Sequence, residues 1–152
     1  MRYQTQRIAY PYFVVALLLF ALQLVMGLWL AFSYFFTVPQ AIVDVFPFST
    51  ARAMHTNLLV LWLLLGFMGA TYYAVPEETE SELAWPKLAY AQLVILSGTG
   101  VAALVGFLLG WTQGRPLLEI PTALDVLIVV GALMFLANVG WTMMKARRFT
   151  AT

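Results

Sequence analysis

The sequence contains no cysteine and only one histidine, His55, and just 10% of its 152 residues are charged. The absence of cysteine excludes disulfide bonds and thiolate metal sites. The absence of a second histidine excludes a metal held by two imidazoles of this chain alone. The formal net charge of +1 offers no basic surface for phosphates, so we expect no nucleic acid among the partners.

Hydrophobic residues make up 62% of the chain, and its mean hydropathy is +0.87. Four stretches carry no Asp, Glu, Lys or Arg: Ile8 to Val43, Ala53 to Pro76, Leu88 to Gly114 and Val126 to Met144. Each is longer than the roughly 18 apolar residues that cross a bilayer core. We therefore predict an all-α membrane protein with four transmembrane helices near residues 10–37, 49–75, 86–112 and 122–146, forming a single membrane-embedded unit over residues 1–152, with membrane lipid as a partner.

The basic residues predict the orientation of these helices, because cytoplasmic loops of membrane proteins are enriched in Lys and Arg. Four spans place both termini on one side. That side, with the loop between the second and third helices, holds Arg2, Arg7, Lys87, Lys145, Arg147 and Arg148, whereas the other side holds Arg52 and Arg115. We expect the termini to be cytoplasmic, and the acidic run from Glu77 to Glu82 to be a solvated turn on the same side.

Residues that start helices and residues that pack them are also visible. Prolines mark three expected helix starts, with Ser49, Thr50 and the Thr122–Asp125 pair as expected caps. Small residues recur at the spacing that lets helices approach closely in lipid. They are Gly27, Ala31, Gly66, Gly69, Ala102, Gly106 and Gly110. We interpret them as packing positions, although a flat cofactor against helix 2 is an alternative.

A lone histidine inside a membrane segment is a functional-site candidate by default, because it is costly to keep there. His55 is also the strongest transition-metal ligand in the chain. By helical spacing it shares a face with Arg52, Leu58, Leu59 and Trp62, which gives a cation, then a ligand, then an apolar wall. That order suits a haem standing edge-on in the membrane. The alternative is a histidine hydrogen-bonded to a neighbouring helix, with Arg52 reaching the surface.

The sequence around His55 resembles helix 2 of the catalytic subunit of bacterial nitric oxide reductases, in the haem-copper oxidase superfamily. The resemblance runs over nearly the whole chain. Its motifs are Arg52-x-x-His55-Thr56-Asn57, Val75-Pro76-Glu77-Glu78, Pro86-Lys87-Leu88-Ala89, Gly114-Arg115, Leu118-Glu119-x-Pro121-Thr122 and Asn138-Val139-Gly140. The first is shared with C-type oxygen reductases, whereas the second and third favour the nitric oxide reductases.

The resemblance implies particular roles for three residues. His55 matches the axial ligand of the low-spin haem b, and Arg52 would lie near the haem propionates. Glu119 matches one of two outer glutamates associated with calcium binding or with proton uptake. Pro116 stands in the place of the other, and proline offers neither a carboxylate nor a backbone donor. Calcium binding by the usual route is therefore not implied here, since calcium needs several oxygen ligands.

The resemblance also implies an incomplete site, because the family subunit has about twelve helices and this chain matches the first four. The second haem ligand, the high-spin haem b and the non-haem iron belong to later helices. We therefore expect a fragment of a larger subunit, or one chain of a split subunit, inactive alone. It would work in the bacterial inner membrane with the remaining helices and a cytochrome c subunit or quinol as electron donor, reducing NO to N2O. The alternatives are part of a C-type oxygen reductase, or a non-catalytic four-helix scaffold or assembly protein.

Overall fold

The structure is a computed structural model that describes residues 2–115 and 119–146. These residues form, in order, the 3₁₀ helix η1 (Gln4–Ile8) and the helices α1 (Ala9–Phe35), α2 (Gln40–Val45), α3 (Phe48–Glu78), α4 (Pro86–Leu108) and α5 (Thr122–Met144). Four segments are long and apolar enough to cross a membrane: η1 with α1, then α3, α4 and α5. No strand is present in the described ranges. The predicted all-α fold with four spans is confirmed. Pro116, Arg147 and Arg148 lie outside the described residues.

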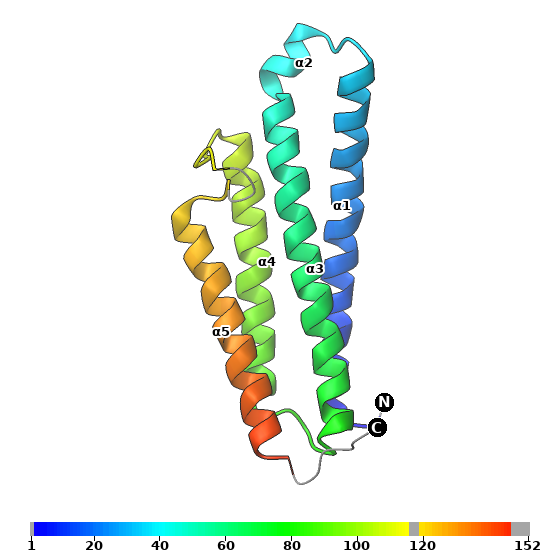
Figure 1. Ribbon diagram of the computed structural model, residues 1–152, viewed down its shortest axis with the longest axis vertical. Coiled ribbons are helices and arrows are strands. Elements are labelled where there is room, and N and C mark those ends of the chain that lie inside the picture. The colour runs from blue at the N-terminus through cyan, green and yellow to red at the C-terminus, as the bar shows by residue number, and fades with distance from the viewer. Residues whose placement is uncertain (1, 116–118, 147–152) are drawn as a thin grey trace.

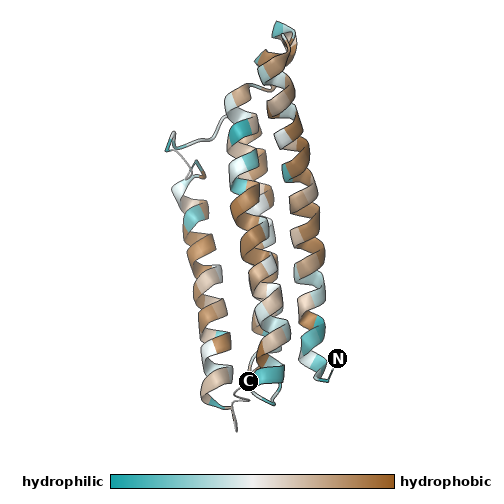
Figure 2. Cartoon of the chain, turned by 45° about the vertical axis from the view of Figure 1, so that its right-hand side comes forward, coloured by the Kyte–Doolittle hydropathy of each residue, from teal (hydrophilic) through white to brown (hydrophobic). Residues whose placement is uncertain are grey.

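The spans run antiparallel, with α3 as the central helix (Figure 1). Its main partner is α1, α4 packs chiefly on α5, and α3 also touches both α4 and α5. One end of the assembly gathers η1, the loop between α3 and α4 and the end of α5, and the other end gathers α2 and the loop between α4 and α5 (Figure 1). Figure 2 shows hydrophobic residues along the middle of the helices and hydrophilic residues near their ends.

The helix ends differ from the predicted ones by a few residues. The span expected over 49–75 continues to Glu78, because Thr79 N donates to Val75 O at 2.9 Å and helical bonding persists around Pro76. The span expected over 86–112 ends at Leu108. Gly110 has φ +77, and Trp111 N donates to Gly106 O at 2.7 Å, which is the glycine stop of a Schellman motif. Gly110 therefore ends a helix, and its interpretation as a packing position was wrong.

The first and last spans and the expected caps also need correction. The spans expected over 10–37 and 122–146 are Ala9–Phe35 and Thr122–Met144, and the short helix α2 was not foreseen. The residues that cap α3 and α5 are Pro47 and Pro121, and neither helix start has a side-chain cap. Because the prolines hold φ near −60, the chain enters each helix without the expected oxygens of Ser49 or Thr122.

The N-terminal segment is bound to the loop between α3 and α4. The carboxylate of Glu82 accepts from Gln4 N and Thr5 N, each at 2.8 Å, and Glu77 Oε1 accepts from Gln6 Nε2 at 2.9 Å. The slight burial of Glu82 raises the pKa of its carboxyl, but the bonds from Thr5 and Gln4 together outweigh that effect and lower it. Glu82 is exposed, as predicted for a solvated turn, but its carboxylate also holds the N-terminal segment, and Glu77 belongs to α3 instead of a turn.

A buried group of polar side chains joins α1, α3 and α4, and we call it the Gln92 cluster. Gln92 Oε1 accepts from Tyr12 Oη at 2.9 Å and from Tyr72 Oη at 2.6 Å. Gln92 Nε2 is 3.0 Å from Met68 Sδ. These four side chains are between 0% and 1% exposed. Nearby, Gly69 packs against Tyr12, where an added Cβ would lie 2.9 Å from Tyr12 Cβ, as the packing interpretation of the glycines expected.

Candidate functional site

His55 lies on α3, and its ring packs against α1. It follows Phe48, the first residue of α3, by seven positions, which places it about 10 Å along the helix axis. Nδ1 is 2.9 Å from Gln23 O, and Nε2 is 3.3 Å from Gln23 Nε2. One residue of α1 therefore contacts both nitrogens of the only imidazole in the chain.

The partners of the ring determine its tautomer. A carbonyl oxygen only accepts hydrogen bonds, so the short contact to Gln23 O places the proton on Nδ1. Nε2 then carries the lone pair and accepts the longer bond from the Gln23 amide. Trp62 Nε1 donates to Gln23 Oε1 at 3.2 Å and so fixes which way that amide points. A histidine with Nδ1–H on a backbone carbonyl and a lone pair on Nε2 is arranged as metal-binding histidines are.

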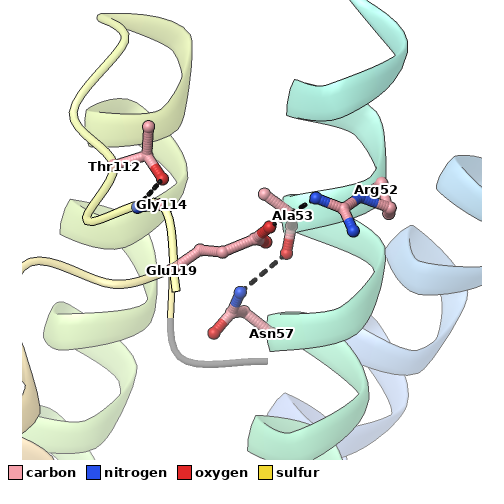
Figure 3. Close-up of polar contacts among 6 residues, drawn as sticks. All are labelled: Arg52, Ala53, Asn57, Thr112, Gly114 and Glu119. Atoms are coloured by element: carbon pink, nitrogen blue, oxygen red, sulfur yellow. Dashed lines mark hydrogen bonds and ion pairs between the residues drawn. The ribbon is translucent and has the colours of Figure 1, made fainter. Parts of the chain in front are cut away.

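Arg52 and Glu119 form an ion pair at the same end of α3. Arg52 Nη2 is 2.8 Å from Glu119 Oε1, and the two side chains are 55% and 8% exposed. Figure 3 shows Arg52 reaching from α3 toward Glu119 in the loop before α5. The same loop is held by Gln113 N, which donates to Glu119 O at 3.2 Å. The pair thus connects the central helix to the loop between α4 and α5.

The face predicted to join His55 to its neighbours divides in two. His55 and Trp62, seven positions apart, both contact Gln23 of α1. Leu58 instead belongs to a buried cluster with Ala103 and Phe107 of α4. The cavity of about 350 Å³ between α3, α4 and α5 is lined by Leu58 and Leu61 among others and does not include His55. The residues expected to form one apolar wall below His55 therefore face two neighbours, because positions i+3 and i+7 lie toward different edges of a wide helical face.

The expected metal role of Glu119 has no further ligand among the described residues. Residues 2–115 and 119–146 contain no group of three or more His, Cys, Asp or Glu that would hold a metal ion. The carboxylate of Glu119 is used by Arg52. Pro116, on which the argument against calcium rests, lies outside the described residues. The role of Glu119 in calcium binding or proton uptake therefore stays a prediction.

Gln23, which is 7% exposed in the middle of α1, was not predicted from the sequence as a site residue. Gln23 lies in the first charge-free window, where an uncharged amide does not alter the transmembrane pattern. The available signal was that a glutamine in an apolar run needs hydrogen-bond partners when it is buried. That signal shows that Gln23 needs a partner but does not show which one. The pairing with His55 depends on the register of α1 against α3.

Two comparisons with known proteins place the chain. Residues 7–152 match the family described as "Cytochrome C and Quinol oxidase polypeptide I". The chain belongs to the haem-copper oxidase family. It is also 43% identical, over 162 aligned positions, to a nitric oxide reductase subunit of Stutzerimonas stutzeri, a match that covers 97% of this chain and 34% of the relative. The resemblance to nitric oxide reductases is confirmed, and the chain spans about a third of that relative's length.

Membership of the haem-copper oxidase family implies haem cofactors. The residues around His55 fit one axial ligand: Nδ1–H is held by the carbonyl of Gln23, and the lone pair of Nε2 meets the Gln23 side-chain amide at 3.3 Å. Arg52, one turn nearer the helix start, is half-exposed and has several N–H donors besides the one used by Glu119. The chain thus offers a ligand for iron and a cation for carboxylates on the same helix.

Glu119 and Asp125 each pair with an arginine, and we expect the two pairs to contribute differently to the free energy of unfolding. We expect Glu119→Gln to lower stability by about 1 kcal/mol, because it removes the charge from a buried acceptor whose partner is half-exposed. Hydrogen exchange at Gln113 N should become faster, since that amide depends on the position of Glu119. The matched control is Asp125→Asn, whose 3.4 Å contact with Arg115 is more exposed and should contribute less than about 0.5 kcal/mol. Equal losses of stability in the two variants would show that the Arg52–Glu119 pair stabilises the fold no more than the exposed pair does.

Proposed function

We propose that this segment belongs to the catalytic subunit of a nitric oxide reductase and that His55 supplies one axial nitrogen to its low-spin haem b. Two observations support the proposal. The relative from Stutzerimonas stutzeri is a nitric oxide reductase subunit, at 43% identity over 97% of this chain. His55 is the sole imidazole of the chain and has its Nδ1 bonded to Gln23 O, which leaves Nε2 as the ligating nitrogen.

Each polar residue of the site then has a task that its geometry allows. A bound haem supplies one-electron oxidation and reduction at its iron. His55 holds Nε2 in a fixed direction, so that a change in oxidation state requires little movement of the ligand. Arg52 offers guanidinium N–H groups near the membrane surface to the propionates, while keeping its bond to Glu119. Glu119, buried beside that cation, is the group that would take part in proton uptake or in calcium binding.

The remaining parts of the site lie beyond the four helices of this chain. We infer that the second axial ligand, the high-spin haem b and the non-haem iron are held by other helices of the complete subunit. There two NO molecules, two electrons and two protons would give N2O and water. The electrons would come from a cytochrome c subunit or from quinol. Among the described residues, His55 is the one imidazole that could hold an electron-carrying haem, and no group of three or more His, Cys, Asp or Glu could hold a further metal, so we expect the segment to be inactive by itself.

We also infer that the protein lies in the bacterial inner membrane with both ends of this segment in the cytoplasm. Among the described residues, the end formed by η1, the loop between α3 and α4 and the end of α5 carries Arg2, Arg7, Lys87 and Lys145. The opposite end carries Arg52 and Arg115. The positive-inside rule favours the cytoplasm for the first of these ends. The ring of His55 would then lie toward the outer face.

The proposal is tested by the substrate that the complete subunit consumes. Membranes containing the full-length subunit, supplied with reduced cytochrome c or with a quinol, should consume two NO per N2O formed, measured with an NO electrode and by gas chromatography. Consumption of O2 without NO would favour a C-type oxygen reductase, which the shared family match also accommodates. A full-length subunit with no Soret absorbance and neither activity would favour a non-catalytic scaffold or assembly protein. Either result would overturn the proposal.

A further inference from the structure

Two residues of α1, Gln23 and Gly27, lie against the ring of His55. They are four positions apart, so the helix directs the N–H of Gly27 toward the carbonyl oxygen of Gln23. A carbonyl oxygen has two lone pairs, and the second is used by His55 Nδ1 at 2.9 Å. An interhelical donor can approach a helical carbonyl from the side only where nearby side chains leave room. Gly27 leaves that room.

The space beside Gly27 is filled by the imidazole itself. A Cβ added at Gly27 would lie 2.9 Å from His55 Cε1 and 3.2 Å from His55 Nδ1, and the neighbours within 4 Å of that Cβ are atoms of this ring. Any other residue at position 27 would therefore push the ring away from Gln23 O. Small residues usually serve to bring helix backbones together. Here the small residue brings a side chain into contact with a backbone.

We propose that Gly27 and the Gln23 carbonyl are positioning residues for the haem ligand: together they fix the Nδ1–H tautomer and the direction in which His55 Nε2 points. This inference rests on the proposed function, because it assumes that Nε2 binds the iron. The backbone contact is 2.9 Å and belongs to a rigid helix, whereas the contact of Nε2 with the Gln23 amide is 3.3 Å and is made by a side chain, whose displacement would also give up the bond from Trp62 Nε1. The first contact would persist with iron bound, and a bound iron would take the place of the second.

The hydrogen bond from Nδ1–H has a consequence for electron transfer. Donating that proton to a carbonyl makes the imidazole more electron-rich and a stronger ligand. A stronger donor stabilises ferric iron more than ferrous iron, so the bond lowers the reduction potential of the low-spin haem. Loss of the bond should raise the potential, and rotation of the ring should change the g values of the ferric haem.

The test uses the full-length subunit with Gly27→Ala, and with Gly98→Ala as the matched control. Gly98 is also a helical glycine, but an added Cβ there meets nothing within 4 Å. Potentiometric titration at the haem α-band and electron paramagnetic resonance of the oxidised protein are the readouts. We expect Gly27→Ala to raise the midpoint potential and shift the g values, and Gly98→Ala to leave both unchanged. Wild-type potential and g values in Gly27→Ala would overturn the inference.

If Gly27→Ala does not accumulate in the membrane, the double variant Gly27→Ala, His55→Ala is compared with His55→Ala alone. In a His55→Ala background the clashing ring is absent, so Gly27→Ala should add no further loss of accumulation. If the double variant accumulates less than His55→Ala alone, the glycine is required for another reason and the inference fails. Failure of the proposed function looks different: His55→Ala would then keep the low-spin haem spectrum, whatever residue stands at position 27.

Discussion

Replacing His55 by alanine in the full-length subunit is expected to remove the low-spin haem signal and to abolish turnover with the physiological donor. Alanine has no lone pair to give to iron, and the described residues contain no other imidazole or thiolate that would take its place. The nearest polar group, the amide of Gln23, is a poor ligand for haem iron. The measurement is the reduced-minus-oxidised spectrum of the purified subunit, together with NO consumption under the same conditions.

The matched control for this substitution is Thr71→Ala. Thr71 lies on the same helix, is partly exposed, and donates to the carbonyl of Phe67 at 2.9 Å, so its loss should leave the spectrum and the turnover unchanged. A stricter check is His55→Gly with added imidazole, which should restore part of the low-spin signal by filling the space of the ring. A His55→Ala subunit that retains a six-coordinate low-spin haem would show that the iron is held by other residues.

The four spans could be predicted from the sequence because membrane crossing depends on composition and length, which are local properties. Charge-free windows located α1, α3, α4 and α5 to within a few residues. The predicted ends of α3 and α4 were wrong, because backbone geometry decides where a helix ends. Pro76 looked like a stop, yet α3 continues past it, and Gly110 looked like a packing residue, yet its positive φ ends α4. A residue type alone does not distinguish these outcomes.

The candidate site could be predicted only in part, for the same reason. A single histidine in an apolar helix drew attention to His55, and the motif drew attention to Arg52 and Glu119. Arg52 pairs with Glu119 only because the loop before α5 folds back over the start of α3. No periodicity in the sequence predicts that loop conformation. The contacts of His55 with Gln23 depend on the register between α1 and α3. Neither the Arg52–Glu119 pair nor the His55–Gln23 contact could therefore be predicted from the sequence.

The Gln92 cluster carries the prediction with the largest expected effect on folding. In the apolar interior a phenol without a partner is costly, so removing the acceptor of Tyr72 should be felt. Tyr12 keeps a second acceptor, because its hydroxyl also lies 2.7 Å from Ala89 O. We expect Gln92→Leu to lower stability by about 1 to 3 kcal/mol. Leucine fills a similar volume, so the loss reports hydrogen bonds rather than a cavity. The measurement is the denaturation midpoint of the detergent-solubilised full-length subunit, followed by loss of helical circular dichroism.

The control for Gln92→Leu is Ala91→Leu, which adds a leucine at the adjacent exposed position of α4 and should change stability little. Tyr72→Phe separates the hydrogen bond from the packing, because it removes the phenolic hydroxyl that donates to Gln92 Oε1 at 2.6 Å while keeping the ring. In the double variant Gln92→Leu, Tyr72→Phe the hydroxyl that lost its acceptor is gone, so the double variant should be more stable than the sum of the two single effects implies. Strictly additive effects would mean that the two side chains are not coupled, and that α1, α3 and α4 are held together by apolar packing without help from this buried amide.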